Sequence, residues 1–339
     1  MAKLNIVDEA VNEAKAVLDD ALEDGEFAIE TNELNVNANG GTEMMQRALA
    51  ARVDPELLSK YQIIPTRVRE LDPDKKSILW IHDMFNDPEV QHLADGGYEK
   101  FDKLVYVSHW QKSTFEMGLN IPPSAGIVLQ NAIEPFNEVA KDKEGPIRLI
   151  YHTTPHRGLE IVYPVFDALS QEYGDKIHLD VFSSFEAYGW PQRDEPFQEL
   201  FQQLKDHEHI TYHGYQPNEV VRKYLERAHI FTYPSIWTET SCIAAIEALA
   251  AGCLTVTSSL GALPETCANF AWMTSFDESA NRHANMHYGL LKAAIDGYWN
   301  EDVQTNLYNQ RAYFNLWYNW QFRQRQWEGL LNGLLSKQS

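Results

Sequence analysis

The hydrophobic positions of this chain fall in short continuous runs separated by amphipathic stretches of helical periodicity. We predict buried strands at residues 77–81, 104–107, 127–129, 147–151, 177–182, 209–212 and 229–233. Buried strands that alternate with helices are typical of parallel sheets covered by helices. The pattern therefore predicts an α/β fold of doubly wound sheets.

A charged stretch at residues 137–146 divides this alternating pattern into two halves. At 339 residues the chain exceeds the usual size of a single hydrophobic core. We therefore expect an N-terminal Rossmann-like domain at 31–136 and a C-terminal Rossmann-like domain at 147–304. A separate aromatic helix is expected at 305–339, where tryptophans at helical spacing favour packing over the stacking of bases or sugars.

Residues 1–30 are interpreted as an N-terminal helical extension, acidic and amphipathic. Such a helix packs against the first domain or against a second subunit, so a homodimer is one of the expected arrangements. The start of the chain lacks the basic flank and apolar run of a signal peptide. No window is apolar enough to span a bilayer, and we expect a cytoplasmic protein without stable membrane insertion.

Two carboxylates mark the stretch that follows the strand 229–233. A helix is predicted to begin near Thr240 or Ser241, residue types that favour caps, and to stop at Gly252. Glu239 stands at the mouth of this helix, and Glu247 lies eight residues later inside it. At about 1.5 Å rise per residue they are roughly 12 Å apart along the axis. That is too far for a shared proton but suits the two ends of one long ligand.

Glu247 is surrounded in sequence by apolar residues, which indicates a buried helix. A buried carboxylate is costly unless it is hydrogen-bonded. Two adjacent hydroxyls of a ribose would supply the hydrogen bonds, and so would a buried arginine or a water-filled groove. The sequence leaves these alternatives open.

Two loops have the composition of anion sites. Gly40 and Gly41 separate an alternating segment from a helix, and free amides at a helix N-terminus favour negative charge. Arg157 precedes the helix after the strand 147–151 and could grip a diphosphate with two parallel hydrogen bonds. The simpler alternatives are a turn for the glycines, and a carbonyl cap or surface ion pair for Arg157.

His82 follows the strand 77–81, and the carboxyl ends of parallel strands face the crevice where such folds bind ligands. The alternative is a histidine at a strand end whose hydrogen bonds are all made within the protein. The three cysteines are too few and too unevenly spaced for a zinc site or a disulfide framework. A packed thiol is the favoured interpretation of Cys242.

The net charge is −21, from 28 basic and 49 acidic residues. Binding to nucleic acid comes mostly from phosphate neutralisation, so this balance disfavours nucleic acid as a general partner. A local basic cleft is compatible with the same balance.

The pattern Glu-x7-Glu before Ala-Leu-Ala-Ala-Gly resembles the signature of retaining glycosyltransferases of family 4, and Gly261-Ala262-Leu263-Pro264-Glu265 resembles their Gly-Gly-x-Pro-Glu loop. The resemblance implies the GT-B fold, in which two Rossmann-like domains face each other across a cleft and a C-terminal helix crosses back to the first domain. The family usually reads Glu-x-Phe-Gly-Ile after the first glutamate. Here Ser241 replaces the aromatic residue and Cys242 replaces the glycine.

The resemblance also implies roles for residues at matching positions. Glu239, His82 and Arg157 are the expected catalytic residues, with Glu239 on the sugar hydroxyls and His82 near the acceptor. The other donor-site candidates are Gly40, Gly41, Thr153 and Thr154 for the phosphates, Gly214 and Tyr215 for the base, Glu247 for the ribose, and Thr240, Ser241, Cys242 and Ile243 for the sugar. The acceptor-side candidates are Ser108, His109 and Trp110.

The function implied is retaining transfer of a sugar from a nucleotide-diphospho-sugar, UDP- or GDP-linked, to a hydroxyl acceptor by front-face attack. The acceptor is a glycan or a small molecule, with nucleic acid or protein less favoured; nucleic acid is disfavoured by charge. No metal and no other cofactor is implied. The alternatives are a GT-B nucleotide-sugar epimerase or hydrolase, and a non-catalytic nucleotide-sugar-binding scaffold.

Overall fold

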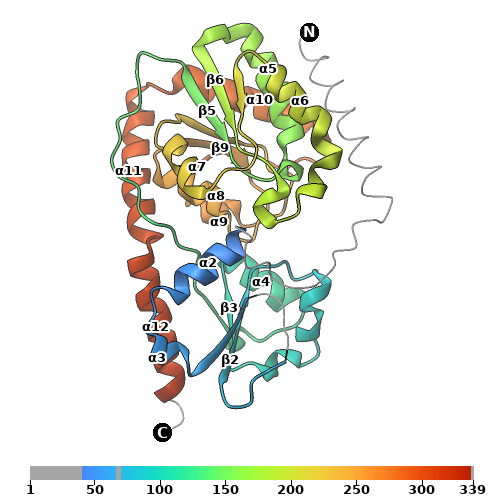
Figure 1. Cartoon of the computed structure of the whole chain (residues 1–339), viewed down its shortest axis with the longest axis vertical. Coiled ribbons are helices and arrows are strands. Elements are labelled where there is room, and N and C mark those ends of the chain that lie inside the picture. The colour runs from blue at the N-terminus through green and yellow to red at the C-terminus, as the bar shows by residue number, and fades with distance from the viewer. Residues whose placement is uncertain (1–39, 66–69, 337–339) are drawn as a thin grey trace.

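The computed structural model describes residues 40–65 and 70–336 and contains two parallel sheets, one in each half of the chain (Figure 1). The expected N-terminal helix at 1–30 and the alternating segment before Gly40 lie outside the described residues. Within them, the sheets and their helices confirm the α/β fold of two Rossmann-like units that the sequence predicts.

The first sheet has the strand order β1-β2-β3-β4. Its strands are β1 Tyr61–Pro65, β2 Lys76–Ile81, β3 Lys103–Tyr106 and β4 Gly126–Val128, and its helices are α2 Gly41–Ala50, α3 Pro55–Leu58 and α4 His109–Gly118. Alternate residues of β2 point to opposite faces, as strand geometry requires. Trp80 packs in one core with α2, whereas Leu79 packs in another with Phe115 of α4.

The second sheet has the order β10-β9-β8-β5-β6-β7. Its strands are β5 Ile147–Tyr151, β6 Ile177–Val181, β7 Ile210–Tyr212, β8 Ile230–Tyr233, β9 Leu254–Ser258 and β10 Trp272–Thr274. Its helices are α5 Leu159–Tyr173, α6 Gln198–Asp206, α7 Asn218–Leu225, α8 Ile243–Ala250, α9 Leu263–Thr266 and α10 Ala280–Gly297. The strand order reverses between β5 and β8, and ligands of such sheets bind outside the carboxyl ends at this switch point.

The helix after β8 begins later than the sequence predicts. It starts at Ile243 rather than near Thr240 or Ser241, and Cys242 is its N-cap residue without a side-chain cap. The Thr240 hydroxyl instead donates a hydrogen bond to the His82 carbonyl of the first domain, at 2.9 Å. A tertiary contact thus replaces the local cap that residue type alone favours.

The chain passes between the domains twice, at neighbouring points. Ile133 forms a parallel bridge with Asn319, and its amide donates to the Tyr318 carbonyl at 2.8 Å. This second passage separates α11 Glu301–Trp317 from α12 Trp320–Ser336. Figure 1 shows α12 (red) running along the first domain, as the resemblance implies for the end of the chain.

Packing anchors α12 to the first sheet. The Trp327 ring lies edge-on to Trp80, with 4.9 Å between ring centroids, and the Tyr61 hydroxyl donates to the Leu331 carbonyl. Trp320 and Trp327 are buried, whereas Trp317 on α11 is 40% exposed. For the two buried rings, the structure supports packing over ligand stacking.

We expect Trp327→Ala to destabilise the protein by about 3–5 kcal/mol, because it leaves a cavity between α12 and β2. Trp317→Ala is the matched control and should cost less than about 1 kcal/mol, since that ring is partly exposed. Urea unfolding followed by circular dichroism measures both. Equal losses in the two variants would contradict the anchoring role of Trp327.

Candidate functional site

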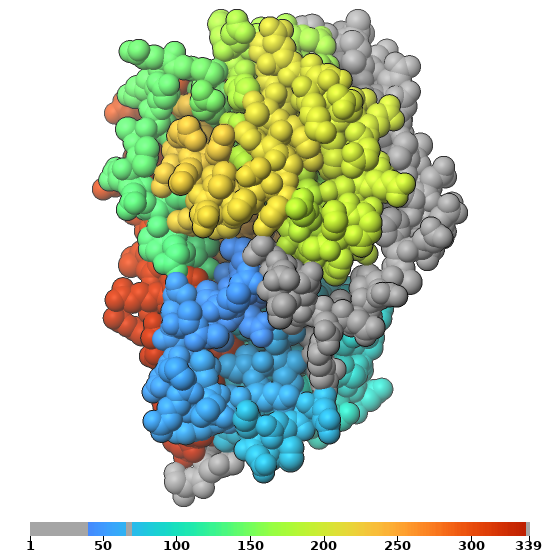
Figure 2. All heavy atoms as spheres, viewed as in Figure 1, coloured from blue at the N-terminus to red at the C-terminus, as the bar shows by residue number. Residues whose placement is uncertain are grey.

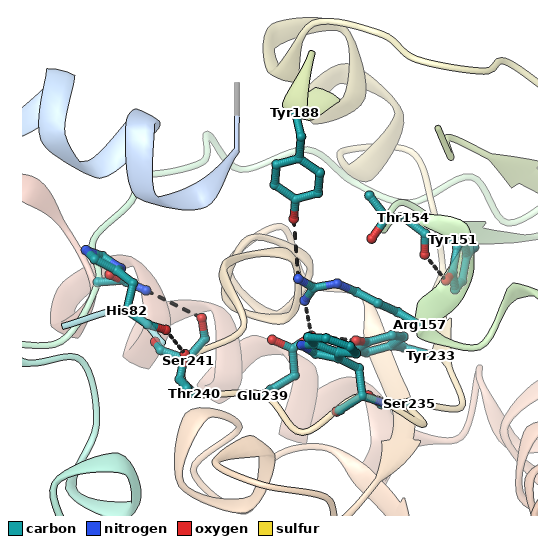
Figure 3. Close-up of polar contacts among 12 residues, drawn as sticks. His82, Tyr151, Thr154, Arg157, Tyr188, Tyr233, Ser235, Glu239, Thr240 and Ser241 are labelled. Atoms are coloured by element: carbon teal, nitrogen blue, oxygen red, sulfur yellow. Dashed lines mark hydrogen bonds and ion pairs between the residues drawn. The ribbon is translucent and has the colours of Figure 1, made fainter. Parts of the chain in front are cut away.

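The candidate site lies at the carboxyl ends of β5 and β8, where two loops of the second domain face the first domain (Figure 3). The first loop is residues 152–158 and carries Arg157. The second is residues 234–242 and carries Glu239. Seen from outside, the atoms of α2 (blue) lie directly against the second domain (Figure 2).

An ion pair between a partly buried arginine and a buried glutamate joins the two loops. Arg157 Nη1 lies 2.6 Å from Glu239 Oε1, and the Tyr233 hydroxyl donates to the same oxygen at 2.5 Å. Arg157 Nη2 donates to the Tyr188 hydroxyl at 3.3 Å, and the guanidinium carbon lies 5.5 Å from the centre of the Trp237 ring. The structure thus brings together two predicted catalytic residues, and pairs them with each other.

The charges of this cluster are stabilised mutually. Burial lowers the pKa of Arg157, but the Glu239 carboxylate together with Tyr188, Tyr233 and Cys242 raises it by more, so the guanidinium remains protonated. Burial, followed by the Glu239 charge, raises the pKa of Tyr233 far above its usual value. The Tyr233 hydroxyl therefore keeps its proton and acts as a donor.

Two glycines fix the backbone around the pair. Gly261 has φ of +62°, and a Cβ there would lie 2.5 Å from the Glu239 carbonyl oxygen. The Ala262 amide donates to that carbonyl at 2.7 Å. Gly158 has φ of +125°, and a Cβ there would lie 2.5 Å from the Pro234 carbonyl oxygen. The Gly-Ala-Leu-Pro-Glu loop therefore positions Glu239 through its backbone.

Unused donors lie next to Arg157. The Thr154 hydroxyl and Arg157 Nε are buried without a hydrogen-bond partner among the described residues. The Thr154 carbonyl is already engaged, because it accepts from the Tyr151 hydroxyl at 2.9 Å and from the Arg157 amide at 3.2 Å. Thr153 precedes them in the same loop. Buried polar groups are normally satisfied, so unpaired donors at this point are suited to an anionic ligand.

The predicted glycine pair of the first domain reaches this region. Gly40 is the N-cap residue of α2, and a Cβ there would lie 2.6 Å from the Tyr188 ring. A Cβ on Gly41 would lie 3.1 Å from Ile243 Cδ1, at the start of α8. Two segments far apart in the sequence are therefore in contact, and only small residues permit this approach.

Glu247 has protein partners on both oxygens. Arg222 Nη1 donates to Oε1 and Asn218 Nδ2 donates to Oε2, each at 2.9 Å. Burial raises the pKa of Glu247, and Arg222 opposes that rise. Of the alternatives left open by the sequence, the described residues show a buried arginine. Nothing in the α7 sequence distinguishes Arg222 from an ordinary surface arginine.

The segment before α8 touches the first domain. Besides the Thr240 contact, the Ser241 carbonyl accepts from Asn131 Nδ2 at 3.4 Å. Cys242 has φ of −82°, a conformation open to any residue, so the loss of the family glycine causes no backbone strain here. Burial raises the pKa of the Cys242 thiol, which is therefore neutral and packed, as expected.

His82 and the predicted acceptor-side residues belong to the first domain, after β2 and β3. His82 Nε2 is buried without a hydrogen-bond partner among the described residues, and burial lowers its pKa to about 3. The imidazole is therefore neutral at physiological pH. The Ser108 hydroxyl caps α4 by accepting from the Gln111 amide at 3.0 Å.

The amides at the start of α4 are already occupied. His109 N and Trp110 N donate to the two carboxylate oxygens of Glu265, at 2.9 and 2.7 Å. Glu265 belongs to the second domain, so its carboxylate interacts with a helix N-terminus across the domain boundary. From the sequence Glu265 is only the last residue of a motif. The structure makes it an interdomain contact.

Gly214 and Tyr215 follow β7, so they lie at the carboxyl ends of the parallel strands, as the Arg157 loop does. Gly214 has φ of +63°, and its carbonyl accepts from the Ser183 amide at 3.1 Å. The loop therefore needs glycine and is tied to the segment that leads to Tyr188. Its predicted contact with a base is not tested by these contacts.

Other features of the described residues lie apart from the Arg157–Glu239 pair. A cavity of about 410 Å³ is lined by Ala140, Asp142, Arg148, His178, Asp180, Thr211, His213, Tyr224 and Arg227, none of them a predicted site residue. No group of three or more His, Cys, Asp and Glu side chains in the described part of the chain could hold a metal ion. No helix there is both long and apolar enough to cross a membrane.

Part of the chain matches a known family of proteins. Residues 132–285 match the family model of glycosyl transferases group 1. A search of curated proteins finds no significant match to the sequence. The matched segment contains Arg157, Glu239 and Glu247, so the family resemblance includes the centre of the candidate site.

Solved structures share the fold at low sequence identity. A glycosyltransferase from Rickettsia africae has a TM-score of 0.60 and 15% identity, covering 90% of this chain and 84% of its own. Sucrose-phosphate synthase from Thermosynechococcus elongatus has a TM-score of 0.62 and 16% identity, and the match covers 78% of this chain and 69% of the synthase. Anabaena HepE, solved with UDP and glucose, has a TM-score of 0.54 and 13% identity, and the match covers 76% of this chain and 72% of HepE. The resemblance to GT-B glycosyltransferases is confirmed.

We expect Gly261→Ala to destabilise the protein by at least about 1 kcal/mol, because alanine is strained at positive φ and its Cβ meets the Glu239 backbone. Gly289→Ala is the control: this exposed position in α10 has nothing within 4 Å of a new Cβ, and alanine there should stabilise by up to about 1 kcal/mol. Thermal unfolding distinguishes them. Loss of stability in both, or in neither, would contradict this account.

Proposed function

Because residues 132–285 match the family of glycosyl transferases group 1, we propose that this chain is a retaining glycosyltransferase. It transfers a sugar from a nucleotide-diphospho-sugar to a hydroxyl acceptor. The observation that carries the proposal is the buried Arg157–Glu239 pair, which faces Gly40 and Gly41 of the first domain. UDP is the favoured nucleotide, since HepE was solved with UDP and glucose.

The diphosphate is assigned to the Arg157 loop. On binding, the two phosphates replace hydrogen bonds to water with hydrogen bonds from Arg157 and the Thr154 hydroxyl. Gly40 and Gly41 add backbone amides at the start of α2. The charge that develops on the leaving diphosphate is thereby stabilised without a metal ion in our scheme. When phosphate engages Arg157, the Glu239 carboxylate is free to accept hydrogen bonds from sugar hydroxyls.

Glu247 is assigned to the ribose. Each of its oxygens accepts one hydrogen bond from the protein and retains a second lone pair for a ribose hydroxyl. Gly214 and Tyr215 stand beside the base. The sugar then extends from the phosphates toward the backbone of Thr240, Ser241, Cys242 and Ile243.

The reaction proceeds by attack on the face from which the diphosphate leaves. The bond between the anomeric carbon and the phosphate oxygen breaks, the acceptor oxygen bonds to the same face, and the acceptor proton passes to the departing diphosphate. Positioning and charge stabilisation are then the tasks of the protein. Neutral His82 adjoins the acceptor hydroxyl, and Ser108, His109 and Trp110 form the acceptor-side wall.

The acceptor is a glycan, a small molecule or a protein, and the net charge of −21 disfavours nucleic acid. We place the reaction in the cytoplasm, because all three cysteines are free and buried, as suits a reducing compartment. An epimerase or hydrolase and a non-catalytic scaffold are the other candidates. Donor turnover without any acceptor would favour the first, and binding without turnover would favour the second.

The first test is thermal unfolding with UDP-, GDP-, ADP- and dTDP-sugars, without added metal. A ligand that binds only the folded state at about 100 times its dissociation constant stabilises it by roughly 2.7 kcal/mol. One of the sugar nucleotides should raise the unfolding temperature. If none does, the donor assignments fail. Retention is then checked by the NMR coupling of the anomeric proton in the product.

Arg157→Gln should abolish this stabilisation by the nucleotide, because the guanidinium is the phosphate ligand. Removing one partner of a buried pair also costs about 3–5 kcal/mol of stability. The double variant Arg157→Gln, Glu239→Gln leaves no uncompensated charge, so it should fold better than the single variant yet remain unresponsive. Arg282→Gln, at an exposed pair with Asp277, is the control that keeps the response.

A further inference from the structure

Arg222 on α7 contacts two parts of the molecule with one guanidinium. Nη1 donates to Glu247 Oε1 at 2.9 Å, whereas Nη2 donates to the backbone carbonyls of Glu134 at 2.9 Å and Pro135 at 3.2 Å. The guanidinium carbon also lies 3.6 Å from the centre of the Phe136 ring. Its planar fork therefore joins the predicted ribose ligand to the segment 134–136.

The segment 134–136 adjoins the point where the chain leaves the first domain. Ile133, the residue before it, forms the bridge to Asn319 at the second passage between the domains. The Phe136 amide donates to Asn315 Oδ1 at 2.6 Å, and Asn315 Nδ2 donates to the Ala250 carbonyl at the end of α8. The passage is thus tied to α8, the helix that carries Glu247, by a second route.

The same segment is tied to α2. The Glu134 carboxylate pairs with Arg52, which follows α2, and the Arg52 guanidinium lies 5.2 Å from the centre of the Trp320 ring. The other end of α2 begins at Gly41, which is in contact with Ile243 of α8. A closed series of contacts therefore runs from Glu247 of α8 through Arg222, Glu134 and Arg52 to α2. It ends where Gly41 of α2 meets Ile243 of α8.

We propose that Arg222 is a positioning residue that couples binding of a nucleotide ribose at Glu247 to the orientation of the first domain. The proposal rests on the proposed function, because it requires a nucleotide at Glu247. A ribose diol would bind the same Glu247 carboxylate as Arg222 Nη1. Any resulting shift of the guanidinium would also change the hydrogen bonds from Nη2 to the carbonyls of residues 134 and 135. A ligand changes a domain equilibrium only through such a difference in contacts between two states.

The test compares Arg222→Gln with Arg227→Gln. Arg227 lies on the same stretch of chain and is exposed, and its described contacts are with the Lys223 carbonyl and the Tyr224 ring. UDP and GDP are the probes. Calorimetry gives their affinity, and small-angle scattering gives the radius of gyration with and without saturating nucleotide.

We expect nucleotide to reduce the radius of gyration of the unsubstituted protein and of Arg227→Gln. Arg222→Gln should bind at least tenfold more weakly and keep an unchanged radius at saturation. Arg222 lowers the pKa of Glu247, so its removal should also move the acidic loss of nucleotide affinity to higher pH. A purely structural defect would not move that pH profile.

If Arg222→Gln is poorly folded, Arg222→Lys tests the same coupling between nucleotide binding and domain orientation. It keeps the charge but not the planar fork, so nucleotide should still bind while the change in radius is lost. Binding and compaction that are normal in both variants would overturn the coupling and leave the proposed function intact. Binding that is weak but still accompanied by compaction would also overturn it. If neither nucleotide binds the unsubstituted protein, the coupling proposal falls, whereas the proposed function falls only if the ADP- and dTDP-sugars also fail to stabilise the protein.

Discussion

The buried pair between Arg157 and Glu239 is the interaction on which the arrangement of the site depends. Removing two charges from water costs several kcal/mol per ion, and only good geometry with further hydrogen bonds offsets this. Tyr233 and Tyr188 supply those bonds, while Gly158 and Gly261 let the two loops approach. The loops of β5 and β8 are thus held together by charge before any ligand binds.

The domain boundary is the second determinant. Its contacts use polar groups that would otherwise be left unpaired, such as the α4 amides on Glu265 and the His82 carbonyl on Thr240. Such contacts are directional, whereas apolar packing is not. Contacts of this kind therefore help to set the relative orientation of the two domains beside the candidate site.

Much of the fold follows from local pattern. The apolar runs predict the seven strands β2 to β8 to within about one residue at each end, because a buried parallel strand must be apolar on both faces. The strands β1, β9 and β10 are not among those seven predicted runs. The glycine pair at Gly40 and Gly41 marks the start of a helix in the sequence, but only the structure shows that it approaches Tyr188 and Ile243. The start of α8 is mispredicted, since Thr240 bonds to His82 instead of capping its own helix.

The partners within the site could not be found in the same way. Tyr188, Arg222 and Glu265 gain their significance from residues that are 31, 25 and 155 positions away in the sequence. A tyrosine in a loop or an arginine on an amphipathic helix carries no local sign of such a contact. The sequence therefore identifies the groups that bear charge, but not the pairs that they form in the folded chain.

The position of the two passages between the domains has a mechanical consequence. Ile133 and Asn319 are bridged, so both covalent connections cross the boundary at one place. Rotation of one domain about this place stretches neither connection, whereas sliding the domains apart would break the bridge. The two passages therefore form a hinge between the domains, and the hinge angle determines how far apart the domains lie on the side opposite the hinge.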